Sequence, residues 1–191
     1  VLNGLTGVDL NNQVVVIPKP VTVSGTSISN SGGNGLEVHS HGTINLSYLD
    51  SSNNIFNGIM VDNCDTDGSR CLGSGAVTLT GSQTDRNRIY ENYQNGVSIT
   101  SNGVVTLLYS DIETSAVSGV VIRTHNAVTM TGLKVHDSFE DGIYVNNCDL
   151  DTLNRKCRGA GAVSLLGWSN EIDESGGYGL YVYTISLVTL N

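Results

Sequence analysis

The sequence is poor in charged, aromatic and proline residues, and these shortages exclude several classes of protein. Charged residues make up only 14% of the 191 residues, while proline occurs twice and tryptophan once. Nine Lys and Arg are scattered among 18 Asp and Glu, so the basic stripe of a nucleic-acid-binding protein is missing and the net charge is −9. No apolar run approaches the roughly 18 residues of a membrane-spanning helix. Neither a nucleic acid nor a membrane is therefore an expected partner.

What the sequence has instead is a repeated motif of glycine, an apolar residue, any residue and a second apolar residue. Its copies begin at Gly35, Gly58, Gly96, Gly119, Gly142 and Gly179, at spacings of 23, 38, 23, 23 and 37 residues. A second motif, apolar, threonine-like, apolar, begins at Val21, Ile44, Val77, Val105, Val128, Val163 and Val188. Each motif alternates apolar and polar residues, which is the period of a strand with one buried face.

Short strands that recur every 23 residues predict a chain that coils, with each strand above its copy one turn earlier. We expect an all-β fold, a right-handed parallel β-helix that forms a single domain over residues 1–191. About seven coils are expected to start near residues 12, 35, 58, 96, 119, 142 and 179. At about 4.8 Å per coil the rod is roughly 35 Å long. The polar residue before most glycines, such as Asn57, should be left-handed or hydrogen-bond the backbone at a corner.

Four cysteines form two close pairs within the extra residues of the two long coils. Disulfides Cys64–Cys71 and Cys148–Cys157 are predicted, each in a projecting loop. The pairs lie three coils apart, about 14 Å along the rod, which is too far for bonds between them. Free thiols or zinc are the alternatives, and zinc lacks both a CxxC spacing and a nearby histidine. Disulfides favour an extracellular or cell-surface location.

A larger repeat overlies the small one, because Gly35 lies 84 residues before Gly119 and Gly58 lies 84 before Gly142. With these motifs, from about residue 12 to the end, the chain resembles the tandem right-handed parallel β-helix repeats of large secreted bacterial surface proteins and adhesins. The resemblance implies the fold and a surface location. It does not select one activity, because pectin lyases, polysaccharide hydrolases, phage tailspikes and adhesins share this fold.

An enzyme built on this fold would need acidic residues in one column on neighbouring coils. Counting six residues from the start of each second motif gives the column Ser27, Asp50, Gln83, Asp111, Lys134 and Ser169. Its two acids are two coils apart, so the sequence predicts no catalytic residue and no cofactor. Acidic residues with metal-binding character occur only in the cysteine loops, at Asp62, Asp65 and Asp67 around Cys64 and at Asp149 and Asp151 after Cys148. The first three are a weak calcium candidate, and a solvated acidic loop is the preferred interpretation.

The sequence therefore favours a structural role in an extracellular fibre or cell-surface stalk. Counting 23 residues back from Gly35 reaches Asn12, and the Asn12 of a following copy would fall 24 residues beyond Gly179. Copies of the chain are thus expected to stack head to tail, and a fragment cut in phase is the alternative. A glycan-binding adhesin module with outward Tyr144 and Tyr181 stacking on sugars ranks second. A polysaccharide lyase or hydrolase ranks third.

Overall fold

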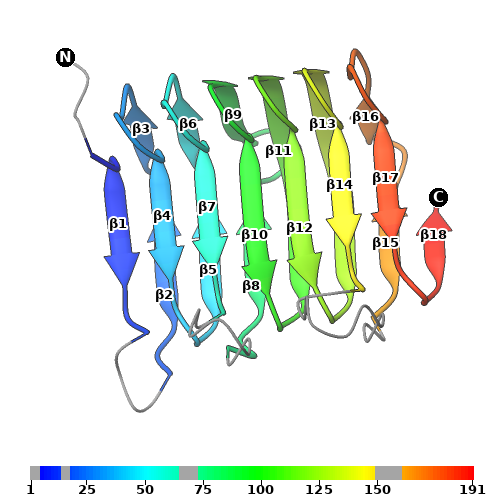
Figure 1. The fold of residues 1–191 in the computed structure, drawn as a ribbon, viewed down its shortest axis with the longest axis horizontal. Coiled ribbons are helices and arrows are strands. Elements are labelled where there is room, and N and C mark those ends of the chain that lie inside the picture. The colour runs from blue at the N-terminus through cyan, green and yellow to red at the C-terminus, as the bar shows by residue number, and fades with distance from the viewer. Residues whose placement is uncertain (1–4, 14–17, 65–72, 149–160) are drawn as a thin grey trace.

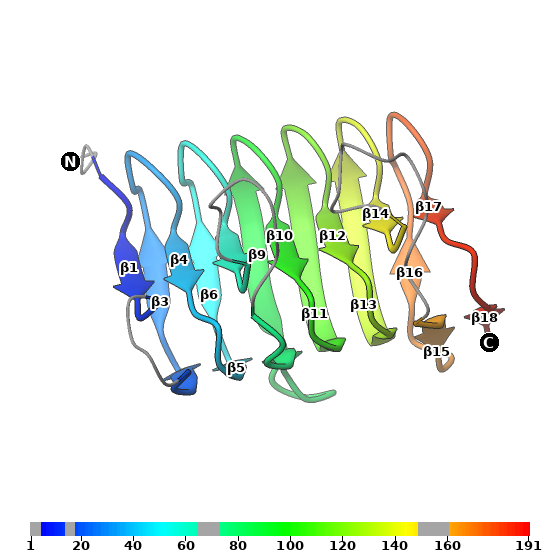
Figure 2. The same cartoon turned by 60° about the horizontal axis from the view of Figure 1, so that its bottom comes forward.

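The computed structural model describes residues 5–13, 18–64, 73–148 and 161–191, and every regular element in these ranges is a strand (Figure 1). Within them there is no helix with the length and apolarity needed to cross a membrane. The strands stack in three rows as the chain coils, and all pairs of neighbours are parallel. The first and last coils lie at opposite ends of the stack (Figures 1 and 2). The chain is thus a parallel β-helix.

The first row is a seven-stranded sheet in which each strand follows a motif glycine. It consists of β1 (Val8–Asn11), β4 (Leu36–His39), β7 (Ile59–Asp62), β10 (Val97–Ser101), β12 (Val120–Thr124), β14 (Ile143–Asn146) and β17 (Leu180–Tyr183). The register pairs Leu36 with Ile59 and Val120 with Ile143, as the glycine spacing predicts.

The second row carries the second motif, and a third row follows it around a corner. The second row consists of β2 (Val21–Ser24), β5 (Ile44–Ser47), β8 (Val77–Thr80), the first halves of β11 (Val105–Ser115) and β13 (Val128–Ser138), β15 (Val163–Leu166) and β18 (Val188–Leu190). The third row consists of β3 (Ser27–Ser29), β6 (Asp50–Ser52), β9 (Asn87–Asn92), the second halves of β11 and β13, and β16 (Glu171–Ile172). The two motifs predict the first two rows, and the third row is an addition.

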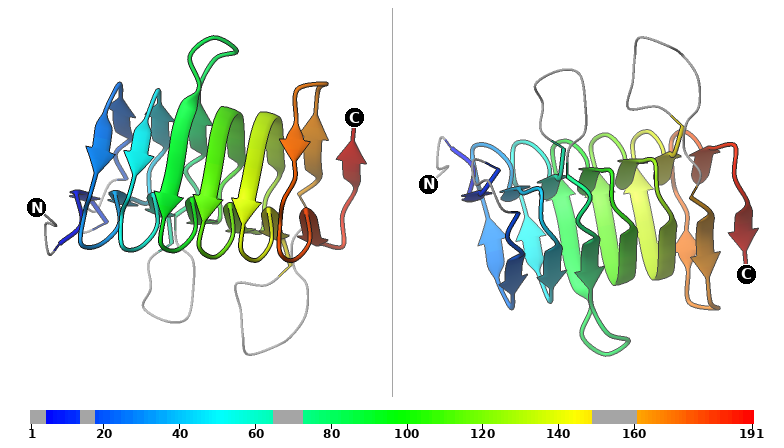
Figure 3. Two further views of the ribbon diagram at one scale, coloured as in Figure 1. Left: turned by 90° about the horizontal axis from the view of Figure 1, so that it is seen from above. Right: turned by 90° about the horizontal axis from the view of Figure 1, so that it is seen from below.

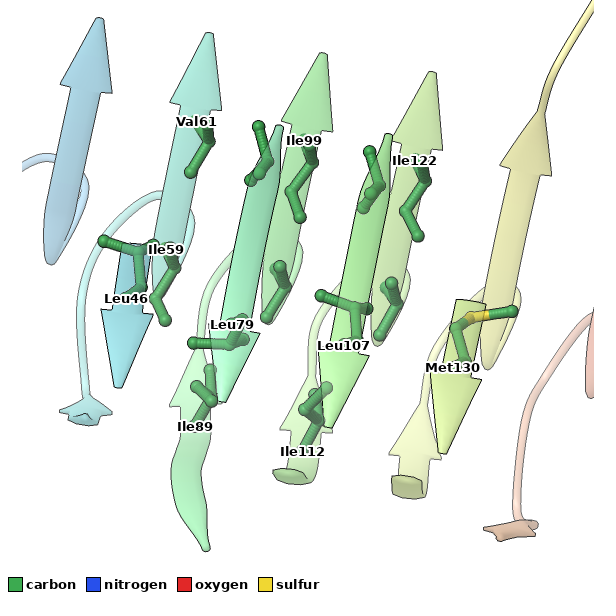
Figure 4. Close-up of a cluster of buried hydrophobic side chains, with 14 of the residues drawn as sticks. Leu46, Ile59, Val61, Leu79, Ile89, Ile99, Leu107, Ile112, Ile122 and Met130 are labelled. Carbon is green, nitrogen blue, oxygen red and sulfur yellow. The ribbon is translucent and has the colours of Figure 1, made fainter. Parts of the chain in front are cut away.

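Inward side chains from the three rows fill a narrow core of Val, Leu and Ile (Figure 4). Ile59 and Val97 of the first row, Leu79 and Leu107 of the second and Ile112 of the third are fully buried. Complete burial of one such side chain contributes about 1.5–3 kcal/mol. Because the alternation of each strand fixes which face it buries, a slip of one residue would expose the whole row.

The expectation that the first coil starts near residue 12 is wrong, because the first coil begins at Gly7. Val8 pairs with Leu36, and Gly7 donates its N–H to the Asn34 carbonyl as Gly35 does to that of Asn57. This coil is therefore 28 residues long rather than 23. The sequence-based argument for stacking assumed that a coil starts at Asn12 in each copy. That assumption is wrong, so the agreement with the larger repeat does not hold.

The motif glycines are required for space, and the asparagines before them hydrogen-bond but are not left-handed. A Cβ on Gly96 would lie 2.4 Å from Cγ2 of Ile112 and 2.8 Å from the carbonyl oxygen of Gly119. The side-chain oxygen of Asn57 accepts hydrogen bonds from the backbone N–H and the amide of Asn95. The left-handed residues lie elsewhere on each coil. The glycines thus let the third row pack against the first.

Candidate functional site

A groove follows the corner where each third-row strand ends, and it crosses several coils. Six successive coils turn this corner with one residue of positive φ, between 49° and 58°, at Asn30, Asn53, Glu91, Thr114, Asp137 and Glu174. For a β-branched residue such as Thr114 this conformation costs about 1–3 kcal/mol. The left-handed turn directs the chain sharply away from the third row, and the side chains on both sides of it enclose the groove.

The groove has a volume of about 970 Å³ and a mixed polar and aromatic lining. The lining residues are Asn53, Glu91, Asn92, Tyr93, Thr114, Ser115, Ala116, Asp137, Ser138, Phe139, Glu174 and Gly176. Tyr93 and Phe139 are 68% and 77% exposed, and the small Ala116 lies on the coil between them. Two coil spacings separate the aromatic residues by about 10 Å. The groove therefore offers two uncovered rings with a gap between them.

Acidic residues on neighbouring coils also line the groove. Asp137 and Glu174 hydrogen-bond through their carboxyl groups, and this bond, with the negative charges of Asp137 and Asp173, raises the pKa of Glu174 above its ordinary value. Beside them, the carboxyl group of Asp173 contacts Nδ1 of His136. Like-charged carboxylates this close favour keeping one proton between them. Sequence reasoning missed this site, although the left-handed positions recur with the motif spacings.

The acidic column expected from the sequence has a different composition in the structure. Longer corners after β8 and β15 shift the register, so Arg88 and Glu171 occupy the places assigned to Gln83 and Ser169. The corner after β8 projects outward from the stack of coils (Figure 3). The column therefore reads Ser27, Asp50, Arg88, Asp111, Lys134 and Glu171.

Alternating charge makes this column a ladder of ion pairs. Asp50 lies 4.0 Å from Arg88, and Lys134 lies 3.2 Å from Glu171. These pairs are solvent-exposed and contribute at most about 1 kcal/mol each. These carboxylates are therefore paired along the rod rather than clustered.

A separate polar network lies on the outer face of the first row. His39 Nε2 is 2.8 Å from Oε1 of Glu37, and His39 Nδ1 is 3.9 Å from the carboxylate of Asp62. Burial raises the pKa of Glu37, but hydrogen bonds from His39, Asn34 and Thr6 outweigh it, so the net pKa is lowered. The network binds β4 to β7.

The weak calcium candidate is only partly within the described ranges. Asp62 is buried and accepts a hydrogen bond from the backbone N–H of Cys64, while Asp65 and Asp67 lie outside the described residues. Among the residues that are described, no cluster of three or more His, Cys, Asp or Glu has the geometry of a metal site.

Cys64 and Cys148 are both buried at the ends of first-row segments. Their predicted partners, Cys71 and Cys157, lie outside the described residues. The two disulfides therefore stay predictions.

Tyr144 and Tyr181 face outward on neighbouring strands, as expected, but they stack on each other. Their ring centroids are 5.4 Å apart and the planes differ by 2°, and Tyr178 packs against Tyr181 at the same separation with a tilt of 40°. Sugar stacking needs a free ring face. Tyr93 and Phe139 in the groove meet that requirement better than this stack does.

Comparison with known proteins supports the fold and leaves the activity open. No protein-family model matches the chain, and no curated protein matches it. Among solved structures, the periplasmic alginate epimerase AlgG is similar with a TM-score of 0.62 and 14% sequence identity. The similarity covers 89% of this chain and 38% of the epimerase chain. At this identity the similarity establishes a shared parallel β-helix fold.

Proposed function

We propose that the chain is a structural segment of an extracellular fibre or cell-surface stalk, in which copies stack end to end. The observation that carries the proposal is that each coil stacks on its neighbour through the same parallel strand pairing, so another coil of the same kind can be added to the row. Val163 of the second row is 2% exposed, whereas its neighbour Val188 in the same row is 41% exposed and Leu190 is 63% exposed. Uncovered apolar side chains beside unpaired strand edges are surfaces that another strand can cover.

A second copy presents the complementary surface at the opposite end. Val8 and Leu10 of β1, with Val21 and Val23 of β2, belong to the same two rows and are half-buried. All strands of the first row are parallel. In the proposed stack, β1 of one copy pairs with β17 of another in the same way that β4 pairs with β1 within one copy. The stacked copies would share one continuous core.

Electron microscopy with a sedimentation dilution series tests this proposal. The expected result is filaments that repeat every 35 Å or so, the length of seven coils, with a mass that falls on dilution. A protein that remains a monomer at high concentration and forms no filaments contradicts stacking between copies. An extracellular location is part of the same proposal and is supported by the resemblance to secreted surface proteins.

A further inference from the structure

We infer that the groove along the left-handed corners binds a polysaccharide of amino sugars whose amines are free and protonated. The inference is independent of whether copies stack, because the groove lies on the side of the rod. It rests on the shape of the groove, its exposed rings and its carboxylates.

The exposed rings fit the apolar faces of sugar rings. Tyr93 and Phe139 carry large exposed surfaces on coils about 10 Å apart. Neither aromatic side chain packs in the core, because the preceding residues, Asn92 and Ser138, are the ones that point inward and are buried. Aromatic faces bind apolar C–H surfaces and protonated amines alike. Ala116 between them leaves room for a linear chain to run along the rod.

The carboxylates select the charge of the ligand. Glu91, Asp137 and Glu174 all line the groove, and no Lys or Arg is among the residues that line it. A uronate polymer would bring like charges together, which costs free energy, whereas protonated amines would form charge-assisted hydrogen bonds with the carboxylates. An amine could also bridge the neighbouring carboxyl groups of Asp137 and Glu174.

Beneath the groove, two buried serine hydroxyls have no hydrogen-bond partner in the protein. Ser115 and Ser138 line the groove and are 3% and 2% exposed, and neither hydroxyl has a hydrogen-bond partner. Buried hydroxyls normally have a partner in the protein, in ordered water or in a ligand. These two hydroxyls face the motif glycines Gly96 and Gly119 inside the coil, so they are suited to ordered water and do not contact a ligand in the groove.

Calorimetric titration with a glucosamine hexamer at about pH 6, where carboxylates of ordinary pKa are charged, tests the inference. We expect saturable binding that weakens with salt. Replacing both aromatic residues (Tyr93→Ala with Phe139→Ala) should weaken it roughly tenfold or more. Asp137→Asn with Glu174→Gln should have a comparable effect. The N-acetylated hexamer should bind more weakly and an alginate hexamer should not bind.

Matched controls separate the groove from general attraction to an acidic protein. Trp168→Ala removes a fully exposed aromatic residue on a different corner, and Asp9→Asn with Asp85→Asn removes two exposed charges elsewhere. Both controls should leave affinity unchanged, and thermal unfolding should show that every variant folds. Equal weakening by the charge control, equally tight binding of hexalysine, preference for the alginate hexamer, or no binding at all would each overturn the inference.

Discussion

Arg86 connects three successive coils from the corner after β8. Its Nε donates to Oδ1 of Asp111 at 2.6 Å, and its guanidinium also donates to the carbonyl oxygens of Ser110 and Gly132. Its side chain is only 15% exposed, so these bonds are largely shielded from water. A planar guanidinium can serve three acceptors at once where an ammonium or an apolar group cannot.

We predict that Arg86→Met lowers the free energy of unfolding by about 1–3 kcal/mol, because it leaves Asp111 and two carbonyl groups without their donor. The matched control is Arg88→Met, whose side chain is 64% exposed and which should cost less than about 1 kcal/mol. Urea denaturation of both variants measures the difference. Equal losses for the two variants would show that Arg86 does not link the coils.

The carboxyl pair of the groove gives the molecule a pH dependence of known sign. The pKa of Glu174 is raised in the folded state, so the folded protein binds this proton more tightly than the unfolded protein does. Stability from this group is therefore greatest below its ordinary pKa of 4.5 and falls as pH rises through the raised value. At pH values above the raised pKa, Glu174 no longer makes this contribution to stability, and the stability no longer changes with its titration.

We predict that Asp137→Asn returns the pKa of Glu174 toward its ordinary value and removes this fall in stability. Asparagine suits the left-handed backbone at position 137 well, so the corner should be preserved. Carboxyl-carbon NMR titration measures the pKa, with Asp9→Asn as a control of equal charge change. An unchanged Glu174 titration would mean that the two carboxyl groups do not interact.

At the scale of strands, the glycine motif contained most of the information about register. It failed at the first coil, although Gly7-Val8-Asp9-Leu10 matches the motif, because the spacing to Gly35 is irregular. The third row was missed because Ser51 interrupts its apolar column of Ile28, Ile89, Ile112, Val135 and Ile172. The groove could not be predicted without that row. Its acidic residues recur with the motif spacing, but the corner on which they lie follows the third-row strands.

Close packing between the first and third rows predicts the effect of adding one methyl group. Gly96→Ala should destabilise the protein by about 1–3 kcal/mol, because the backbone carbonyl of Gly119, 2.8 Å from the new Cβ, cannot move without breaking the ladder. Gly179→Ala is the control, since its nearest neighbour would be 3.6 Å away. Denaturant unfolding that shows no difference between the two would contradict the packing account.

The whole molecule is a rod whose interactions repeat along one axis. The core rows, the side-chain amide hydrogen bonds such as that between Asn95 and Asn57, and the charged column all run from coil to coil. In such a solenoid each coil is stabilised by its two neighbours, so stability depends on what covers the end coils. In the proposed stack, β1 of one copy covers β17 of another in the register of the internal coils.

Intermolecular cross-linking tests that register directly. In the proposed stack Leu180 pairs with Val8 of the next copy, which places Tyr181 beside Asp9, at the roughly 4.8 Å spacing of neighbouring strands and within disulfide range. Mixing a Tyr181→Cys variant with an Asp9→Cys variant should give a disulfide that joins these two positions, identified by peptide mapping. Tyr181→Cys mixed with Asn11→Cys, two residues out of register, should give none. Absence of the first product, or equal yields from both mixtures, would rule out this stacking register.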